Sequence, residues 1–233
     1  MNKHSVLLLT AGIAMTTSIQ AHDVWLEGER GNLRVVYGHV GELQAYDPDK
    51  VKAVRAYNDS GKDVDIRAET NDHSMRVKPA GEAGMITVEY DNGYWTKIDA
   101  TTWENQSKRR FDNYLDASHS LKYNKNLLSW SNEYKQPTGL SFEIVPLENP
   151  LAVRAGDKVT LQVYYQGKPL ADAGVEVHGF DDSFKTDAQG KVEVPLNAKH
   201  DLQHIAAYYR YDVPGHLDAD EVSLTANLVF HTR

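Results

Sequence analysis

Apolar and polar residues alternate with a period of two over most of the second half of the chain. The alternating segments are KVTLQVYYQG at 158–167, GVEVHG at 174–179 and KVEVPL at 191–196. Alternation with β-branched side chains predicts strands that bury one face. Glycine, proline and aspartate between the segments supply turns, and a final strand is expected at 221–230. Strands at such short spacing predict a small antiparallel sandwich.

The first half of the chain has a similar but less regular pattern. Strands are predicted within 32–40, 51–58, 73–78, 84–90 and 93–98. The sequence DNG at 91–93 predicts a hairpin turn, because Asn-Gly tolerates the positive φ angles that such turns need.

One segment of the first half follows helical spacing instead. Phe111, Leu115, Ser118 and Lys122 recur at intervals of three or four residues, and long lysine stems can cover apolar surface. We therefore expect one helical excursion near 108–132.

The stretch EIVPLENPLAVRAGDKV at 143–159 contains two prolines and several turn formers between segments of different texture. We take it as a domain boundary. The predicted fold class is all-β, with two β-sandwich-like domains: an N-terminal β-rich domain at 22–147 that includes the helix near 108–132, and a C-terminal sandwich at 148–233.

The first 21 residues have the layout of a secretory signal peptide. A basic start, MNKHS, precedes the apolar stretch VLLLTAGIAM and the polar end TTSIQA. The apolar stretch is too short to span a bilayer of about 30 Å. We expect cleavage after Ala21 and a periplasmic protein without stable membrane insertion. The absence of cysteine fits a domain that is held together by apolar burial and not by disulfides.

The chain is acidic, with a formal net charge of −8 that becomes −9 once Lys3 is removed with the signal peptide. This charge argues against nucleic acid as a partner, because phosphates need a basic face. It is compatible with a cation as ligand, although acidity alone is mostly a solubility feature.

Two histidines are placed so that they could share a metal ion. Cleavage of the signal peptide would give His22 a free α-amine, which can chelate a cation together with the imidazole Nδ1, and Trp25 indicates that this terminus packs down. His39 follows Gly38 at the end of a predicted strand, where glycine lets the backbone present the ring at the rim of the sheet. Three such nitrogens suit Cu²⁺ or Ni²⁺. The alternative is that both histidines are incidental.

His204 and His119 are the remaining metal candidates. His200 and His204 are four residues apart, as in some zinc sites on helices, but LQHIAAYY reads as a strand, in which they would lie about 13 Å apart. We therefore retain only His204 of this pair. His119 lies on the predicted helix. The alternative for each is a packed or hydrogen-bonded structural histidine.

Other catalytic motifs are absent from the sequence. It has no G-x-S-x-G elbow, no phosphate-binding glycine loop, no HExxH and no cysteine. We expect a protein that is not an enzyme.

The sequence resembles the DUF4198 family of periplasmic proteins, also labelled NikM-like and described as nickel or cobalt transport components. The resemblance rests on AHDVWLE at 21–27, YGHVGE at 37–42, YDPDKVKAV at 46–54, DNGYWTK at 91–97, GLSFEIVPLENP at 139–150, GKPLADAGVEV at 167–177 and TDAQGKVEV at 186–194. It implies a β-rich N-terminal domain, a C-terminal transthyretin- or Ig-like sandwich, a role in nickel or cobalt handling, and motif histidines at His22 and His39.

These observations lead to one main hypothesis and two alternatives. The main hypothesis is a periplasmic divalent-metal-binding protein, an accessory component of Ni²⁺ or Co²⁺ uptake, with Cu²⁺ as a further option and an inner-membrane metal importer as partner. The first alternative is a structural or protein-interaction module that binds no metal. The second is a copper oxidase built on the N-terminal histidine, with a substrate face near Tyr37 or Trp95.

Overall fold

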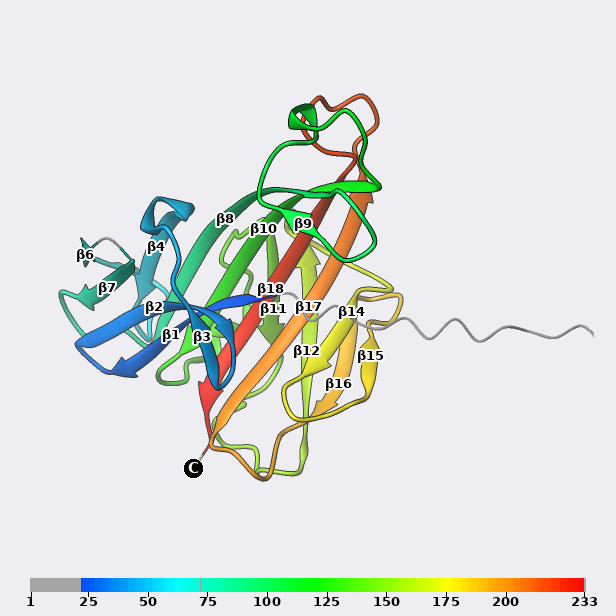
Figure 1. Cartoon of the computed structure of the whole chain (residues 1–233). Coiled ribbons are helices and arrows are strands. Elements are labelled where there is room, and N and C mark those ends of the chain that lie inside the picture. The colour runs from blue at the N-terminus through cyan, green and yellow to red at the C-terminus, as the bar shows by residue number, and fades with distance from the viewer. Residues whose placement is uncertain (1–21, 72, 233) are drawn as a thin grey trace, which may run out of the picture.

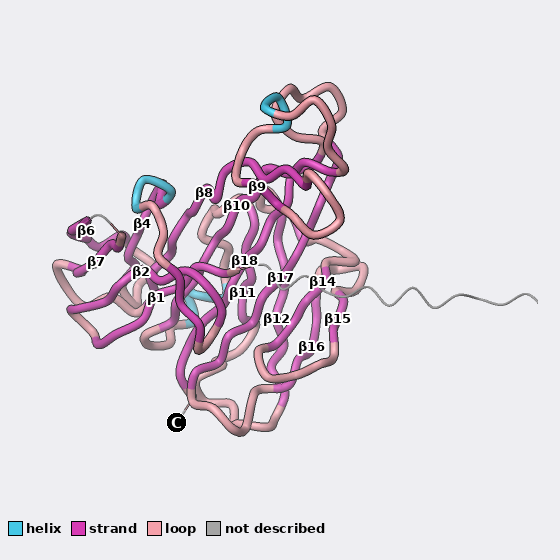
Figure 2. The backbone as a smooth tube through the Cα atoms, in the orientation of Figure 1, coloured by secondary structure: helices cyan, strands magenta, loops and turns pink. Residues whose placement is uncertain are grey.

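The computed structural model describes residues 22–71 and 73–232, and strands dominate its secondary structure. The expected signal peptide at 1–21 lies outside the described residues. Within them, helical structure is limited to three 3₁₀ turns, at Pro48–Lys50, Lys108–Arg110 and Asn132–Lys135 (Figure 2). No helix in this part of the chain has the length and apolar character needed to cross a membrane. The prediction of a mainly β protein with a sandwich-like arrangement is confirmed.

The strands of the described residues form three sheets (Figure 1). The first has the order β1-β2-β7-β6, with β3 beside β2, and contains β1 (Asp23–Glu29), β2 (Asn32–His39), β3 (Glu42–Gln44), β6 (Ile66–Asn71) and β7 (Ser74–Pro79). The third has β12 between β11 and β16, and contains β11 (Phe142–Pro146), β12 (Lys158–Tyr165), β13 (Lys168–Pro169) and β16 (Lys191–Pro195).

The second and largest sheet has the order β15-β14-β17-β18-β10-β8-β4-β5, with β9 beside β8. Its strands are β4 (Val51–Tyr57), β5 (Asp63–Val64), β8 (Met85–Lys97), β9 (Trp103–Glu104), β10 (Asp116–Leu127), β14 (Gly174–Val177), β15 (Ser183–Lys185), β17 (Leu202–Asp212) and β18 (Glu221–His231). The strands expected at 221–230 and around LQHIAAYY are confirmed as β18 and β17.

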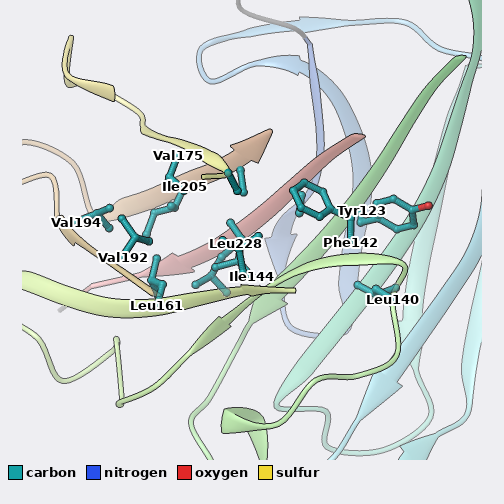
Figure 3. Close-up of a cluster of buried hydrophobic side chains, with 14 of the residues drawn as sticks. Tyr123, Leu140, Phe142, Ile144, Leu161, Val175, Val192, Val194, Ile205 and Leu228 are labelled. Atoms are coloured by element: carbon teal, nitrogen blue, oxygen red, sulfur yellow. The ribbon is translucent and has the colours of Figure 1, made fainter. Parts of the chain in front are cut away.

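The large sheet is covered on both faces. One face packs against β11, β12 and β16 over an apolar core that includes Phe142, Leu161 and Leu228 (Figure 3). The opposite face packs against the sheet of β1 and β2, and this second core includes Val24 and Val88. Because successive side chains of a strand point to opposite faces, β10 contributes to both interfaces.

The large sheet contains strands from both sides of the expected boundary at 147/148. β10 and β18 pair in parallel, with Asn124 opposite Asn227, and β11 pairs with β12 directly across the boundary. The division into domains at 22–147 and 148–233 stays a prediction.

The helix expected near 108–132 is wrong. The segment has one 3₁₀ turn at Lys108–Arg110, and Asp116–Leu127 forms the long strand β10. The same segment contains polar residues whose partners lie on other strands. Asn126 bonds to the backbone of Leu26, and Lys125 pairs with Glu143. These tertiary contacts decide the conformation, because local pattern is a weak prior when partners are distant.

The hairpin expected at 91–93 is also wrong. β8 continues through these residues, and the register with β10 shifts so that Ser120 faces Gly93 and Leu121 faces Asp91. Gly93 has a φ of +81°. The positive φ that favours a hairpin turn serves here to form a β-bulge, which lets one long strand bend without ending.

Candidate functional site

The ends of two paired strands bring His22 and His39 together. β1 and β2 are antiparallel, with Asp23 opposite Gly38, so His22 precedes one strand where His39 ends the other. Their ring centroids are 4.5 Å apart and the ring planes are inclined by 28°. Gly38 has a φ of +140°, and a side chain there would collide with the backbone of Glu42. The expected glycine bend before His39 is therefore present.

The chain next to His22 is anchored to the large sheet. Trp25 is fully buried, and its ring lies edge-on to that of His204, with centroids 5.3 Å apart. The Leu26 amide donates to Asn126 Oδ1 at 3.1 Å, and the Asn126 amide donates back to the Leu26 carbonyl at 3.3 Å. The prediction that this end of the chain packs down is confirmed. We call His22 and His39 the N-terminal histidine pair.

The surroundings of His22 favour its neutral form. Burial lowers the pKa of the His22 imidazole below its usual value of 6.5, and the nearby charges of His39 and Lys122 lower it further. A neutral imidazole has a free nitrogen lone pair, which is the form that binds a metal. The ring is therefore in its coordinating state at neutral pH.

A small polar cavity of about 120 Å³ lies beside His39. We call it the inner cavity, and its lining residues are Asp23, His39, Val40, Glu176, Val177, His178, Phe180, His204, Ala206 and Tyr208. Since a water molecule takes about 30 Å³, the space suits a few waters or a small hydrated ion. It is smaller than the pockets of roughly 300–1,000 Å³ that hold organic ligands.

His204 and Asp23 form the buried floor of the inner cavity. His204 Nε2 lies 3.7 Å from Asp23 Oδ2 and 3.5 Å from Asn227 Nδ2. His204 is 5% exposed and Asp23 is 7% exposed. Burial lowers the pKa of His204, and the charge of Asp23 opposes this shift.

Several buried polar atoms near this floor have no hydrogen-bond partner in the described part of the chain. They are Asp23 Oδ1, Tyr90 Oη, Asn227 Oδ1 and both amide atoms of Asn124. All four residues lie where the sheet of β1 and β2 packs on the large sheet: Asn124 and Asn227 are register partners, and Tyr90 stacks on Tyr37 of β2. Buried polar atoms without hydrogen-bond partners are rare in proteins, and these five atoms lie at one interface between two sheets.

Lys122 and Tyr208 are two further ionisable side chains of this region. Lys122 is almost fully buried, and burial lowers its pKa to about 8. It belongs to none of the ion pairs found among residues 22–71 and 73–232. Burial raises the pKa of Tyr208, and the negative charges of Asp23 and Glu176 raise it further.

His119 lies in a different environment. Its Nε2 is 2.8 Å from Asp91 Oδ1, and its ring stacks on Tyr94 with centroids 4.4 Å apart. Neither partner belongs to the N-terminal histidine pair or the inner cavity. Of the four predicted metal candidates, the structure brings His22, His39 and His204 to one end of β1 and leaves His119 elsewhere.

In the described residues, no three His, Cys, Asp or Glu side chains are grouped so that they could hold a metal ion as they stand. The N-terminal histidine pair supplies two side-chain ligands. The arrangement can therefore offer two imidazole nitrogens to a metal ion. The carboxylate of Asp23 and the imidazole of His204 line the inner cavity next to His39.

Sequence reasoning missed Asp23, Lys122, Asn124 and Tyr208 as members of this region. The sequence did contain one signal in β10. Lys122 and Asn124 are two residues apart, so they lie on the same face of a strand that is mostly buried. Polar residues on a buried strand face indicate either a buried hydrogen-bond network or a binding site. No local signal connected Asp23 with Tyr208, because 184 residues of sequence lie between these neighbours of one cavity.

Comparison with known proteins relates this chain to a protein family, to a bacterial protein and to a solved structure. Residues 19–201 match the family model described as "Domain of unknown function (DUF4198)". An uncharacterized protein of Haemophilus influenzae is 26% identical over 171 residues, which cover 72% of each chain. The structure of the D0-D1 domain of Intimin aligns with 91% of this chain and 98% of its own, at 13% identity and a TM-score of 0.24. That score is too low to support an inference.

Proposed function

This chain belongs to the DUF4198 family, and we propose that it is a periplasmic protein that binds a divalent transition-metal ion at the N-terminal histidine pair, as an accessory component of nickel or cobalt uptake. The observation that carries this proposal is the contact between His22 and His39, whose ring centroids are 4.5 Å apart. The ion is cargo in this proposal, and the protein is a binding protein without catalytic activity.

The donor set fits a borderline divalent cation. Two neutral imidazoles are suitable ligands for Ni²⁺, Co²⁺ and Cu²⁺. Cleavage after Ala21 would add the α-amine of His22 as a third nitrogen, next to the imidazole of the same residue. Soft Cu⁺ is disfavoured, because the chain has no cysteine and only four methionines.

The experiment compares two forms of the protein, one that begins at His22 and one that retains Ala21. Calorimetric titration with Ni²⁺, Co²⁺, Cu²⁺ and Zn²⁺ gives each affinity. We expect the His22 form to bind Ni²⁺ and Cu²⁺ more tightly than the Ala21 form, by more than His39→Ala alone costs. The difference is expected to be largest between about pH 6 and 8, where an imidazole and an α-amine lose their protons. Affinities no tighter than millimolar for all four ions would overturn the proposal.

The copper-oxidase alternative has its own test. The Cu²⁺-loaded protein is incubated with a reductant and either oxygen or peroxide, and consumption of the oxidant is followed. Turnover above that of free Cu²⁺ would favour an oxidase. Its absence is the result that we expect for a carrier.

An interaction with an importer is a second candidate function. It is favoured by two loops that project beyond the large sheet, residues 105–115 between β9 and β10 and residues 213–220 between β17 and β18 (Figure 1). The loops are joined by a hydrogen bond from Ser107 Oγ to Asp218 Oδ1 at 2.7 Å. They carry Leu115 and Leu217, which are 65% and 67% exposed. Exposed apolar side chains on two loops that are joined in this way can form part of a contact surface.

This candidate is tested by replacing both leucines with serine. We expect metal binding by the purified variant to be unchanged and metal uptake by cells to fall to the level of a deletion strain. Wild-type uptake in cells that carry the double variant would contradict a partner contact at these loops.

A further inference from the structure

A cavity of about 520 Å³ lies at the opposite end of β1 from the N-terminal histidine pair. Its wall combines segments attached to all three sheets: Arg30 in the turn between β1 and β2, residues 128–130 after β10, and residues 149–154 between β11 and β12. We call it the arginine cavity. β1 has seven residues at a rise of about 3.3 Å each, so about 20 Å separates it from the histidines. Its volume is within the range of roughly 300–1,000 Å³ that is typical of sites for small organic ligands.

The polar side chains around the arginine cavity are mainly hydrogen-bond donors. Arg30 and Arg154 line it, together with Asn149 and the indole of Trp130, and its described lining contains no Asp or Glu. This composition stands out in a chain whose formal net charge is −8. A guanidinium has five N–H donors and no acceptor, and its planar fork matches the geometry of a carboxylate. The lining therefore favours an anion.

The two arginines have no carboxylate partner within the protein. Arg30 Nη2 donates to the carbonyl of Leu128, which holds the guanidinium at the cavity wall. Neither Arg30 nor Arg154 takes part in any of the ion pairs formed by the residues that the structure describes. Asp59 and Glu82 line a neighbouring hollow that shares Arg30 with this one, and neither is paired with it. Both guanidiniums can therefore pair with a carboxylate that comes from outside.

The remainder of the wall is apolar. Trp130, Leu151 and Val153 line the cavity and are half-buried. The ring of Trp130 stands edge-on to that of buried Tyr134, with centroids 6.3 Å apart, so it is fixed from one side. The Leu151 amide donates to Asn149 Oδ1 at 3.0 Å, which orders the opposite loop. An aromatic ring and two aliphatic side chains beside two guanidiniums suit a ligand that has an apolar body and an anionic end.

We propose that the arginine cavity binds a small organic acid, whose carboxylate pairs with Arg30 and Arg154 and whose apolar body packs on Trp130. Charge-assisted pairs between arginine and carboxylate are among the stronger hydrogen-bonded contacts in proteins. The volume fits a free acid of small size, and the carboxylates of Asp59 and Glu82 beside Arg30 disfavour a long polyanion. The site is separate from the N-terminal histidine pair, so the inference does not depend on metal binding.

The test uses two simple carboxylates, phenylacetate and hexanoate, with two comparison compounds. Phenylacetamide has the shape of phenylacetate without its charge, and inorganic phosphate has the charge without an apolar body. Each is titrated into ¹⁵N-labelled exported protein, and the indole N–H signals of its four tryptophans are followed by NMR. The variant Trp130→Phe identifies the signal of Trp130. We expect the carboxylates to shift that signal and phenylacetate to bind at least about tenfold more tightly than either comparison compound.

Arg30→Gln and Arg154→Gln are the informative substitutions, and Arg109→Gln is the matched control. All three arginines are exposed, so their replacement is compatible with folding. Arg109 precedes the twelve-residue strand β10, whereas Trp130 follows it, so the control removes the same charge far from the cavity. We expect each cavity substitution to weaken phenylacetate binding by at least about tenfold, and the control to change it by less than about twofold.

Four results would overturn the inference. They are an unshifted Trp130 signal with both carboxylates at millimolar concentration, equal affinities for phenylacetate and phenylacetamide, phosphate binding as tight as that of phenylacetate, and equal losses in all three arginine variants. Each leaves the proposed metal binding at the N-terminal histidine pair standing. Conversely, a protein that binds phenylacetate in this way but none of the four metal ions would contradict the proposed function and support this inference.

Discussion

The ammonium of Lys125 and the carboxylate of Glu143 lie 2.7 Å apart with side chains 1% and 0% exposed, and they connect β10 to β11 through the main core. Glu143 also accepts hydrogen bonds from both amide and hydroxyl of Thr138 and from the amide of Gly139. One carboxylate thus satisfies a buried lysine and fixes the loop before β11.

Glu143→Ala is expected to lower the free energy of unfolding by about 3–5 kcal/mol, because it leaves the Lys125 charge buried without a partner. Glu193→Ala is the control, since Glu193 pairs with Lys158 at 2.9 Å on the surface, with side chains 57% and 62% exposed. That substitution should cost less than about 1 kcal/mol. Urea unfolding measures both, and equal losses would show that burial of the first pair is unimportant.

Lys122 should make a contribution to stability that increases between pH 8 and 10. Burial lowers its pKa in the folded protein to about 8, from 10.5. In this range the unfolded chain still holds a proton that the folded protein has released, so the free energy of unfolding increases with pH. The increase from this residue is up to about 2 kcal/mol.

The effect of Lys122 is isolated by comparing wild-type protein with Lys122→Met in urea unfolding at pH 8, 9 and 10. The comparison is required because burial also raises the pKa of tyrosines such as Tyr90, whose deprotonation in the unfolded chain lowers the stability of both proteins as the pH approaches 10. The same slope in both proteins would contradict the assignment to Lys122.

His204 should make the protein less stable below pH 6.5. Burial lowers its pKa below the usual 6.5, so in acid the unfolded chain binds a proton that the folded protein does not. The free energy of unfolding then falls as the pH decreases from 6.5. We expect His204→Gln to lose less stability between pH 7 and 5 than the wild type.

The control for His204→Gln is His73→Gln, at an exposed position in the turn between β6 and β7. This variant should follow the wild-type pH profile when the three proteins are unfolded in urea at pH 7, 6 and 5. An acid loss that persists in full in His204→Gln would assign the effect to other groups.

Gly84 is predicted to tolerate no side chain. A Cβ atom there would meet Tyr134 Oη, Asp59 Oδ1 and Ser129 Oγ, which are connected by hydrogen bonds at 3.1 Å and 2.8 Å. Gly84→Ala should cost about 2 kcal/mol through this overpacking. Gly174→Ala is the matched control, because a Cβ at that position meets nothing within 4 Å. Thermal or urea unfolding compares the two, and equal stability would contradict the steric explanation.

Much of the fold could be predicted from the sequence because one-sided burial leaves a local mark. In β12, Val159, Leu161 and Val163 are all fully buried and alternate with polar residues. That pattern depends only on which face meets the core. β10 could not be predicted in this way, because both of its faces are buried and polar residues on each find distant partners.

The residues of the candidate site also fall into two groups: those that local sequence features predict and those that only the tertiary structure reveals. His22 and His39 could be predicted as candidate metal ligands from the signal peptide, from Gly38 and from the family motifs, because each of these features is local in sequence. The sequence by itself therefore determined a mainly β chain and one pair of histidines worth testing. Only the tertiary structure decided that Asp23 and His204 line the cavity beside His39 and that His119 lies elsewhere. It also decided that Lys122 is buried. The physical reason is that strand pairing and sheet packing connect residues far apart in sequence, and no local pattern records which of them will meet.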